Sequence, residues 1–339
     1  MKKVLVGISG GVDSSVAALL LKKEGYKVIG TTMNLIDSNS KDAKEVCDKL
    51  DIEFRELECK ELFKKCVINY FIEEYKNTKT PNPCIECNKK LKFGYLYDYI
   101  KENNIDYIAT GHYAKVKYSD KYNRYVLKKS DNILKDQSYF LYVINKNILP
   151  HILFPLSNFK NKEEIRQIAK DNNLSIHSKS DSQDICFIKD DYKVFLEENS
   201  NMNNKEGNII LEGKVIGKHT GLYKYTIGQR KGLGIAYHEP LYVIGFNKEN
   251  NELIVGIEKD LYKDSFEVIN YNLLAIDDIL EPIKVNVKVR YKSLEYPATI
   301  IKENEIIKVK LDNPIKGVTS GQSAVFYIDD VVIGGGIIK

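Results

Sequence analysis

The feature that most constrains the fold is a short apolar strand followed at once by a glycine–serine loop and an apolar helix. The strand is expected at 3–8, the loop reads Gly-Ile-Ser-Gly-Gly-Val-Asp-Ser-Ser over 7–15, and the helix is expected at 14–24. Additional strands are predicted at 27–32, 52–57 and 106–110, with helices at 42–50, 61–75 and 89–102. Strands and helices that alternate in this way are typical of a parallel sheet covered by helices.

The second half of the chain has a different pattern. Apolar and polar residues alternate over 283–291, which predicts a half-buried antiparallel strand, and further strands are expected at 298–301, 305–311 and 323–328. An Asn-rich stretch at 199–204 is the best candidate for a linker. We therefore predict an α/β catalytic domain with a parallel sheet at 1–198, a small, mainly β central domain at 199–264 and an antiparallel β-barrel at 265–339.

Composition narrows the class of protein. A chain of 339 residues is too long for one ordinary core, and fractions of 43% hydrophobic and 29% charged residues exclude a disordered protein. No run of about 18 apolar residues occurs, so we expect no membrane span and a cytoplasmic location. The net charge of +4 is compatible with a polyanionic partner without requiring one.

The glycine–serine loop has the composition of a phosphate-binding nest. Glycines let the backbone approach a ligand closely, and the loop and the helix N-terminus supply N–H donors. The loop lacks the Gly-Lys-Ser/Thr of a Walker loop and the G-x-G-x-x-G dinucleotide fingerprint. A turn that only joins strand to helix is the alternative. The segment resembles in full the S-G-G-x-D-S signature of pyrophosphatase-loop enzymes, which cleave ATP between the α and β phosphates.

This resemblance implies that the loop holds the β and γ phosphates of ATP and leaves the α phosphate open to attack. Asp13 would lie near a magnesium ion. Met33 matches a position that contacts adenine, although ordinary core packing is an alternative for it, and Gly111 matches a second nucleotide-contacting position. The matching loop residues are Gly7, Ile8, Ser9, Gly10, Gly11, Val12, Asp13 and Ser14.

Three of the six cysteines stand out from ordinary helix and strand patterns. Cys84 and Cys87 form a C-x-x-C pair after Asn82-Pro83, and Cys186 follows Ser-Gln-Asp-Ile at 182–185. A structural zinc site would need two further ligands at matching spacing, which the sequence lacks. A thioredoxin-type redox pair does not fit the preceding pattern. The other three are expected to be small buried hydrophobic residues: Cys47, Cys59 and Cys66.

The loop and both cysteine segments together resemble the tRNA-specific 2-thiouridylases, which act on the wobble uridine. Matching segments at 135–140, 217–222, 225–230 and 321–327 extend the resemblance over nearly the whole chain. It implies an adenine-nucleotide alpha-hydrolase-like catalytic domain that uses ATP and magnesium, with tRNA as one partner and a persulfide sulfur-donor or sulfur-relay protein as another.

The family mechanism, carried over residue by residue, gives the cysteines their roles. The uridine oxygen attacks the α phosphate, and the base becomes adenylated as pyrophosphate leaves. Cys186 matches the cysteine that holds persulfide sulfur, and Cys87 matches the nucleophile paired with it. Either direct sulfur transfer or hydrosulfide release with a Cys87–Cys186 disulfide completes the exchange. Both need an electropositive or hydrogen-bonded setting, because only thiolates react well.

One position departs from the family. Many members carry Asp, the proposed base-contacting or acid/base group, where this chain has Cys84. With three cysteines, Cys84, Cys87 and Cys186 could hold a four-iron–four-sulfur cluster whose open iron binds the transferred sulfur. A cluster route therefore stands beside the persulfide route.

The resemblance also implies a set of tRNA contacts. Lysine and arginine neutralise phosphates, and a flipped-out base needs a flat side chain to stack on. For His112 a loop histidine is the alternative, and Arg290 could simply lie on the solvent face of its strand. The matching residues are His112, Lys135, Asp136, Gln137, Arg290, Tyr291 and Gln322.

Two other functions remain open from the sequence. The argininosuccinate, GMP, NAD and deazapurine synthetases use the same loop with a nitrogen nucleophile, but they do not need Cys87 and Cys186. A non-catalytic RNA-binding or cysteine-based sensor protein would make no AMP and pyrophosphate from ATP in the presence of tRNA.

Overall fold

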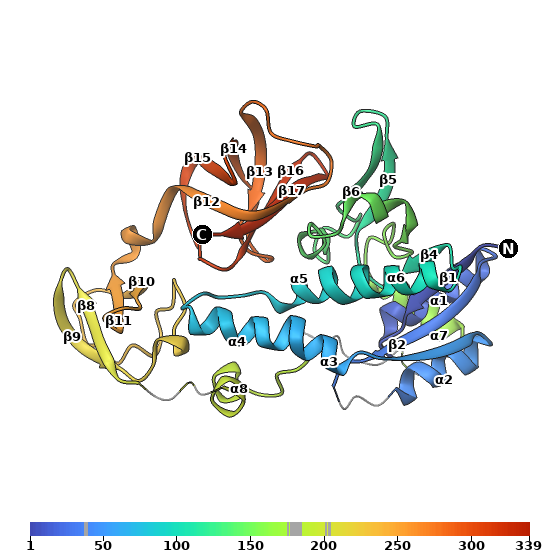
Figure 1. Ribbon diagram of the computed structural model, residues 1–339, viewed down its shortest axis with the longest axis horizontal. Helices are drawn as coiled ribbons and strands as arrows, with labels where there is room; N and C mark the ends of the chain where they lie inside the picture. Colours follow the sequence, from blue (N-terminus) through green and yellow to red (C-terminus); the bar gives the residue numbers. More distant parts are fainter. Residues whose placement is uncertain (37–39, 175, 177–184, 201, 203–204) are drawn as a thin grey trace.

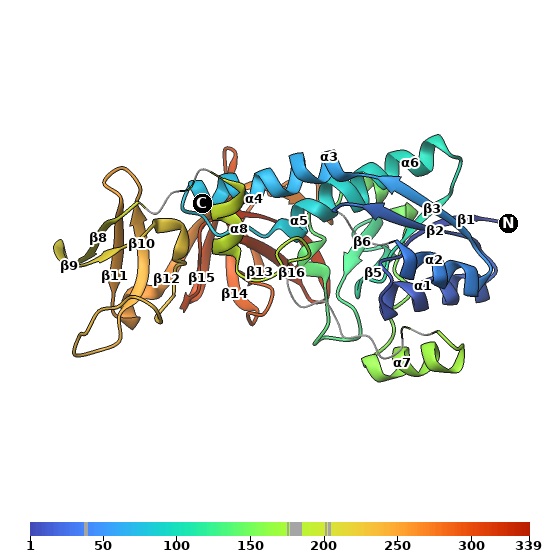
Figure 2. The same cartoon turned by 90° about the horizontal axis from the view of Figure 1, so that it is seen from below.

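The chain forms three β-sheets, with helices gathered around the first of them (Figures 1 and 2). The computed structural model describes residues 1–36, 40–174, 176, 185–200, 202 and 205–339. The Ser-Gln-Asp stretch at 182–184 and positions 201, 203 and 204 of the predicted linker lie outside the described residues. Within the described residues, no helix has both the length and the apolar character needed to cross a bilayer.

The first sheet is parallel, with the strand order β3-β2-β1-β4-β7. Its central strand is buried on both faces: Val4 and Val6 pack against α1, α2 and α7, whereas Leu5 packs against the helices of the other face. The predicted parallel sheet covered by helices is confirmed. The strands are β1 Lys3–Gly7, β2 Lys27–Asn34, β3 Glu53–Glu58, β4 Tyr107–Ala109 and β7 Ile152–Leu153, and the three helices are α1 Val12–Lys23, α2 Lys41–Leu50 and α7 Lys162–Asp171.

Two long helical rods cover the opposite face of this sheet (Figure 1). The first runs without a break through α3 Lys60–Phe63, the π-helix η1 Lys64–Ile68 and α4 Asn69–Lys76. The second runs through α5 Pro83–Cys87, the π-helix η2 Asn88–Tyr95 and α6 Leu96–Glu102.

The predicted start of the second rod at residue 89 is wrong. The rod begins at Pro83, because proline is well tolerated in the first turn, where its missing N–H has no helical partner to lose. Its wide π turn depends on Gly94, where a Cβ would lie 2.8 Å from the Lys89 carbonyl oxygen. The C-x-x-C pair therefore lies on a helix rather than in a loop.

The carboxyl-terminal strands close into a barrel, as predicted. The order is β12-β15-β14-β13-β16-β17, and β12 pairs with both β15 and β17. A hairpin of the first region joins the same sheet where Lys128 pairs with Val331. The strands are β5 Lys115–Ser119, β6 Arg124–Lys128, β12 Tyr262–Leu273, β13 Ile283–Lys288, β14 Tyr296–Glu303, β15 Ile306–Lys316, β16 Ser323–Ile328 and β17 Val331–Ile338.

Between these regions lie helix α8 Tyr192–Asn199 and a four-stranded sheet with the order β10-β11-β8-β9. Ile209, Val243 and Leu253 form the centre of its small core. The strands are β8 Gly207–Leu211, β9 Lys214–His219, β10 Tyr242–Asn247 and β11 Glu252–Gly256. The domain limits at 198/199 and 264/265 stay predictions.

Candidate active site

The glycine–serine loop is organised by its own hydrogen bonds. The Ser9 amide donates to Ser14 Oγ at 3.2 Å, and the Ser15 hydroxyl donates to the Gly11 carbonyl oxygen at 2.9 Å. Gly10 has φ +72°, and a Cβ there would lie 2.7 Å from the Cβ of Asp42, so only glycine fits. The loop thus directs the N-terminus of α1 at the carboxyl edge of the parallel sheet, where anions bind.

Asp13 is held by two side chains from distant elements. The Tyr113 hydroxyl donates to Asp13 Oδ1 at 2.7 Å, and Lys162 Nζ lies 2.9 Å from Asp13 Oδ2. Lys162 is the first residue of α7, and its side chain is largely buried. The sequence did not reveal the role of Lys162. The local pattern there indicates only a helix cap, in which Asn161 accepts a hydrogen bond from the Glu164 amide.

The two other predicted nucleotide contacts lie near this loop. Gly111 packs so closely that a Cβ would lie 2.8 Å from the Ser14 amide nitrogen and 2.9 Å from the Asp13 carbonyl carbon. Met33 lies in β2, half-buried, and packs against the core between the sheet and the helical rods. A single carboxylate such as Asp13 suits Mg²⁺ when nucleotide phosphates supply the remaining ligands.

The second rod and the segment before α8 bring three thiols together. Cys87 is buried, whereas Cys84 and Cys186 keep exposed surface, and all six cysteines are free thiols. Partial removal from water is the largest effect on these thiols and raises the pKa of each, that of Cys186 to about 11. Negative charge on Cys87 and then on Cys84 raises the pKa of Cys186 further.

Lys92 is the cation that acts on this group. It belongs to η2, about two helical turns beyond Cys84, and its ammonium lowers the pKa of Cys84, Cys87 and Cys186, partly offsetting the effect of burial. A π turn rotates the chain less per residue than an α turn, which brings Lys92 back toward the face that carries Cys84. Sequence reasoning missed Lys92, because a lysine in a lysine-rich helix has no distinguishing pattern.

His112 lies between the segment that packs on the nucleotide loop and the second helical rod. Its Nδ1 lies 2.8 Å from Thr110 Oγ1, and its ring lies 6.0 Å from that of Phe93, the neighbour of Lys92 on η2. Burial, and secondarily the charge of Lys92, holds the His112 pKa well below its usual value, so the imidazole is neutral at neutral pH. His112 can therefore hydrogen-bond to an RNA base but cannot pair with phosphate as a cation.

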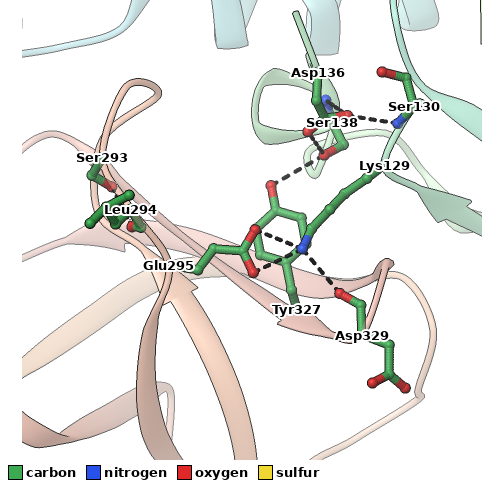
Figure 3. A network of polar contacts seen from close by, with 9 residues as sticks. All are labelled: Lys129, Ser130, Asp136, Ser138, Ser293, Leu294, Glu295, Tyr327 and Asp329. Atoms are coloured by element: carbon green, nitrogen blue, oxygen red, sulfur yellow. Dashed lines mark hydrogen bonds and ion pairs between the residues drawn. The ribbon is translucent and has the colours of Figure 1, made fainter. Parts of the chain in front are cut away.

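The predicted contacts at 135–137 lie in one loop, and Figure 3 shows the hydrogen bonds of its central member, Asp136. Asp136 is buried and accepts hydrogen bonds from the Ser130 amide at 2.9 Å and the Ser138 hydroxyl at 2.6 Å. Gln137 Oε1 accepts from the Tyr113 amide at 3.0 Å, whereas Lys135 is exposed. Asp136 and Gln137 therefore shape the loop, and Lys135 is the member that faces solvent.

The predicted contacts of the barrel lie at its junctions with the other regions. Arg290 does not lie on the solvent face of a strand: it follows β13, and its guanidinium donates to Gly317 O at 3.0 Å, Thr319 Oγ1 at 2.6 Å and Ile227 O at 3.3 Å. Gln322 Nε2 donates to Thr80 O at 2.6 Å, which ties the barrel to the segment before α5. Tyr291 packs its ring 4.4 Å from that of Phe140.

The iron–sulfur alternative stays a prediction. Among the residues that the structure describes, which include all six cysteines, no group of three or more His, Cys, Asp or Glu side chains is arranged to hold a metal ion. We therefore derive no chemical step through a cluster.

Comparison with known proteins gives matches along the whole chain. Three family models match: a tRNA methyl transferase HUP domain at 2–190, a tRNA methyl transferase PRC-barrel domain at 193–257 and an aminomethyltransferase beta-barrel domain at 263–338. These matches, together with the three sheets, confirm the predicted fold class.

Three relatives that match over nearly their full length share the same name. The tRNA-specific 2-thiouridylase MnmA of Clostridioides difficile is 44% identical, with 100% of this chain and 98% of the relative covered. Proteins of the same name from Acetivibrio thermocellus and Clostridium kluyveri are 45% and 46% identical, with at least 99% of each chain covered. At this identity and coverage, the chain belongs to the tRNA-specific 2-thiouridylase family.

Proposed function

We propose that this protein is an ATP-dependent sulfurtransferase that replaces the 2-carbonyl oxygen of the wobble uridine of tRNA with sulfur. The observation that carries the proposal is the segment from Thr110 to Tyr113. It contacts the nucleotide loop through Gly111 and Tyr113 and the thiol-bearing rod through His112. An ATP site and a thiol site that share one wall are what a coupled adenylation and sulfur transfer requires.

The first step would activate the base. The uridine O2 attacks the α phosphorus of ATP, the bond to the bridging oxygen breaks, and pyrophosphate leaves from the glycine–serine loop. Donors of the loop and of the α1 N-terminus stabilise the departing charge. Magnesium, when bound, would neutralise part of the phosphate charge near Asp13.

The second step would transfer sulfur. The terminal sulfur of a Cys186 persulfide attacks C2, and AMP leaves with the former carbonyl oxygen. The Cys87 thiolate then attacks Sγ of Cys186, which releases the 2-thiouridine and leaves a Cys87–Cys186 disulfide. An external thiol must reduce that disulfide, and a persulfide donor protein must reload Cys186.

The positive charge of Lys92 would help the three thiols to ionise. Burial holds the three thiols in the protonated form at neutral pH, and only thiolates are good nucleophiles. The Lys92 ammonium opposes that effect at each thiol. Cys84 would lie beside the reacting base, where many relatives carry an acid.

Mass spectrometry of nucleosides tests the proposal. Unmodified tRNA is incubated with the protein, ATP, magnesium and a persulfide-loaded sulfur-donor protein, then digested. Formation of 2-thiouridine together with AMP and pyrophosphate supports the proposal. Release of AMP with a nitrogen acceptor and without sulfur would instead favour an amidating synthetase, and absence of AMP would favour a binding protein.

A further inference from the structure

Several highly exposed aliphatic side chains lie next to the predicted tRNA contacts in the sequence. Among the described residues other than the amino-terminal Met1, four large aliphatic side chains are more than 70% exposed: Ile133 at 72%, Leu134 at 94%, Leu280 at 92% and Leu294 at 76%. Ile133 and Leu134 directly precede Lys135, and Leu294 follows Tyr291 by three residues. Single exposed apolar residues are ordinary, but three of these four flank two segments assigned to the same ligand.

The loop that carries Ile133 and Leu134 is fixed from within. Asp136 accepts from Ser130 and Ser138, the Ser130 hydroxyl donates to Asn132 O at 2.9 Å, and the Lys135 amide donates to Asn132 Oδ1 at 3.2 Å. The polar side chains thus turn inward. The two aliphatic side chains turn outward, although water disfavours their exposure.

On the barrel side, Leu294 is also exposed next to a residue that is held by polar contacts. Its neighbour Glu295 is paired with Lys129 at 2.6 Å, and Lys129 also donates to Asp329 O at 3.0 Å (Figure 3). The Ser138 hydroxyl lies 3.2 Å from that of Tyr327, so the same network includes the 130–138 loop. The loop that carries Ile133 and Leu134 and the segment that carries Leu294 are therefore both held at the junction between the catalytic region and the barrel.

The positive charges beside these aliphatic side chains favour a nucleic acid over a protein as the partner. Exposed Lys135 follows Leu134, and exposed Lys292 precedes Leu294 by two residues. An apolar side chain next to a lysine matches a nucleotide, which offers an apolar base face beside a phosphate. Protein interfaces instead favour a continuous apolar core from which lysine is depleted.

We infer that Ile133, Leu134 and Leu294 are apolar contacts for unstacked bases of the anticodon arm, and that they keep the arm open around the uridine that reacts. Proteins that distort nucleic acids insert leucine, isoleucine or methionine side chains in this way. The inference rests on the proposed function and adds to it how the RNA is deformed. In this account the side chains of Ile133, Leu134 and Leu294 contact the faces of the bases, and the lysines bind the phosphates.

The test compares the double variant Ile133→Ser/Leu134→Ser and the variant Leu294→Ser with Leu280→Ser. Leu280 is the matched control, because it is as exposed but lies in the connection between β12 and β13. The Kd for an unmodified tRNA transcript with a wobble uridine is measured over a series of salt concentrations, alongside KM and kcat for thiolation with sulfide. Melting temperatures confirm that these exposed substitutions leave the fold intact.

We expect the double variant to bind tRNA about tenfold more weakly, Leu294→Ser several-fold more weakly, and Leu280→Ser like the parent. The slope of log Kd against log salt should stay unchanged, because no phosphate contact is lost, whereas Lys135→Ala should lower it by about one.

Three results would overturn the inference. These are parental Kd and KM values in both variants, an equal loss in Leu280→Ser, and a defect that appears only with a persulfide-loaded donor protein and not with sulfide. The last would assign Ile133, Leu134 and Leu294 to the donor protein. Failure of the proposed function is distinct, since the parent protein itself would then form no 2-thiouridine while tRNA binding remained measurable.

Discussion

The nucleotide loop and the thiol group are two halves of one candidate site, and they are prepared for their chemistry to different degrees. The loop comes from nine consecutive residues, and its own hydrogen bonds fix its shape at the N-terminus of α1. The thiols come from one helix and a segment about a hundred residues away, and their surroundings favour the unreactive protonated form.

The difference indicates where control of the reaction lies. A preformed nest would bind ATP with little rearrangement, so in the proposed mechanism activation of the base needs only the correct RNA. In the same mechanism, sulfur transfer depends on ionisation of the thiols, and the Lys92 ammonium lowers their pKa against the effect of burial. Substitutions in one half should therefore change either pyrophosphate release or thiolation without an equal change in the other.

The largest effect is expected from Cys186→Ser and Cys87→Ser. With a persulfide-loaded donor protein as the sulfur source, each should lower 2-thiouridine formation by more than about 10³-fold, since a serine hydroxyl neither carries persulfide sulfur nor attacks a disulfide. Release of pyrophosphate in the presence of tRNA should persist, because the loop is untouched. Equal loss of both activities, measured by mass spectrometry and by pyrophosphate release, would contradict the separation of the halves.

Gly111→Ala should impair both halves. The new Cβ would press on the Ser14 amide and the Asp13 carbonyl carbon, and a displacement of the loop by a fraction of an ångström should cost about 10²-fold in pyrophosphate release and thiolation. Gly245→Ala is the matched control, because a Cβ there meets nothing closer than 3.9 Å. Parental rates in Gly111→Ala would mean that this contact does not position the loop.

Lys92→Met should affect only the thiol half. Loss of the ammonium raises the pKa of Cys87 and Cys186 further, so the thiolate fraction at neutral pH falls and the rising limb of the pH–rate profile moves to higher pH. Pyrophosphate release should be nearly unchanged. Lys89→Met and Lys90→Met, exposed positions of the same helix, serve as controls. An unshifted profile would remove Lys92 from the mechanism.

The smallest effect on chemistry is expected from Arg290→Ala. Loss of its bonds to Gly317, Thr319 and Ile227 leaves acceptors unpaired, which should lower the free energy of unfolding by about 1–3 kcal/mol in chemical denaturation. The rate with saturating tRNA should change little. Lys292→Ala, an exposed neighbour, is the control for loss of positive charge alone.

Local patterns predicted the regular elements well. The strand before the loop and the alternation through β13 both depend on neighbours in sequence. The start of the second rod was missed because Asn82-Pro83 also signals a turn, and tertiary packing decides between the two.

Residues whose roles depend on distant partners could not be predicted. Lys92 acquires its effect on Cys186 only through the fold, and Lys162 meets Asp13 across 149 positions. The family resemblance implies tRNA contacts at Asp136 and Arg290, and their internal hydrogen bonds could not be read from the sequence; the tRNA contacts stay predictions. The roles of Cys84, Cys87 and Cys186 stay predictions.

The most direct test of the central claim, that ATP activates the same uridine oxygen that sulfur replaces, is isotope transfer. A tRNA whose wobble uridine carries heavy oxygen at O2 is converted by the protein with ATP, magnesium and sulfide. The account predicts one heavy oxygen in each AMP for every 2-thiouridine formed. Thiolation that leaves AMP unlabelled, or heavy oxygen that appears only in water, would contradict it.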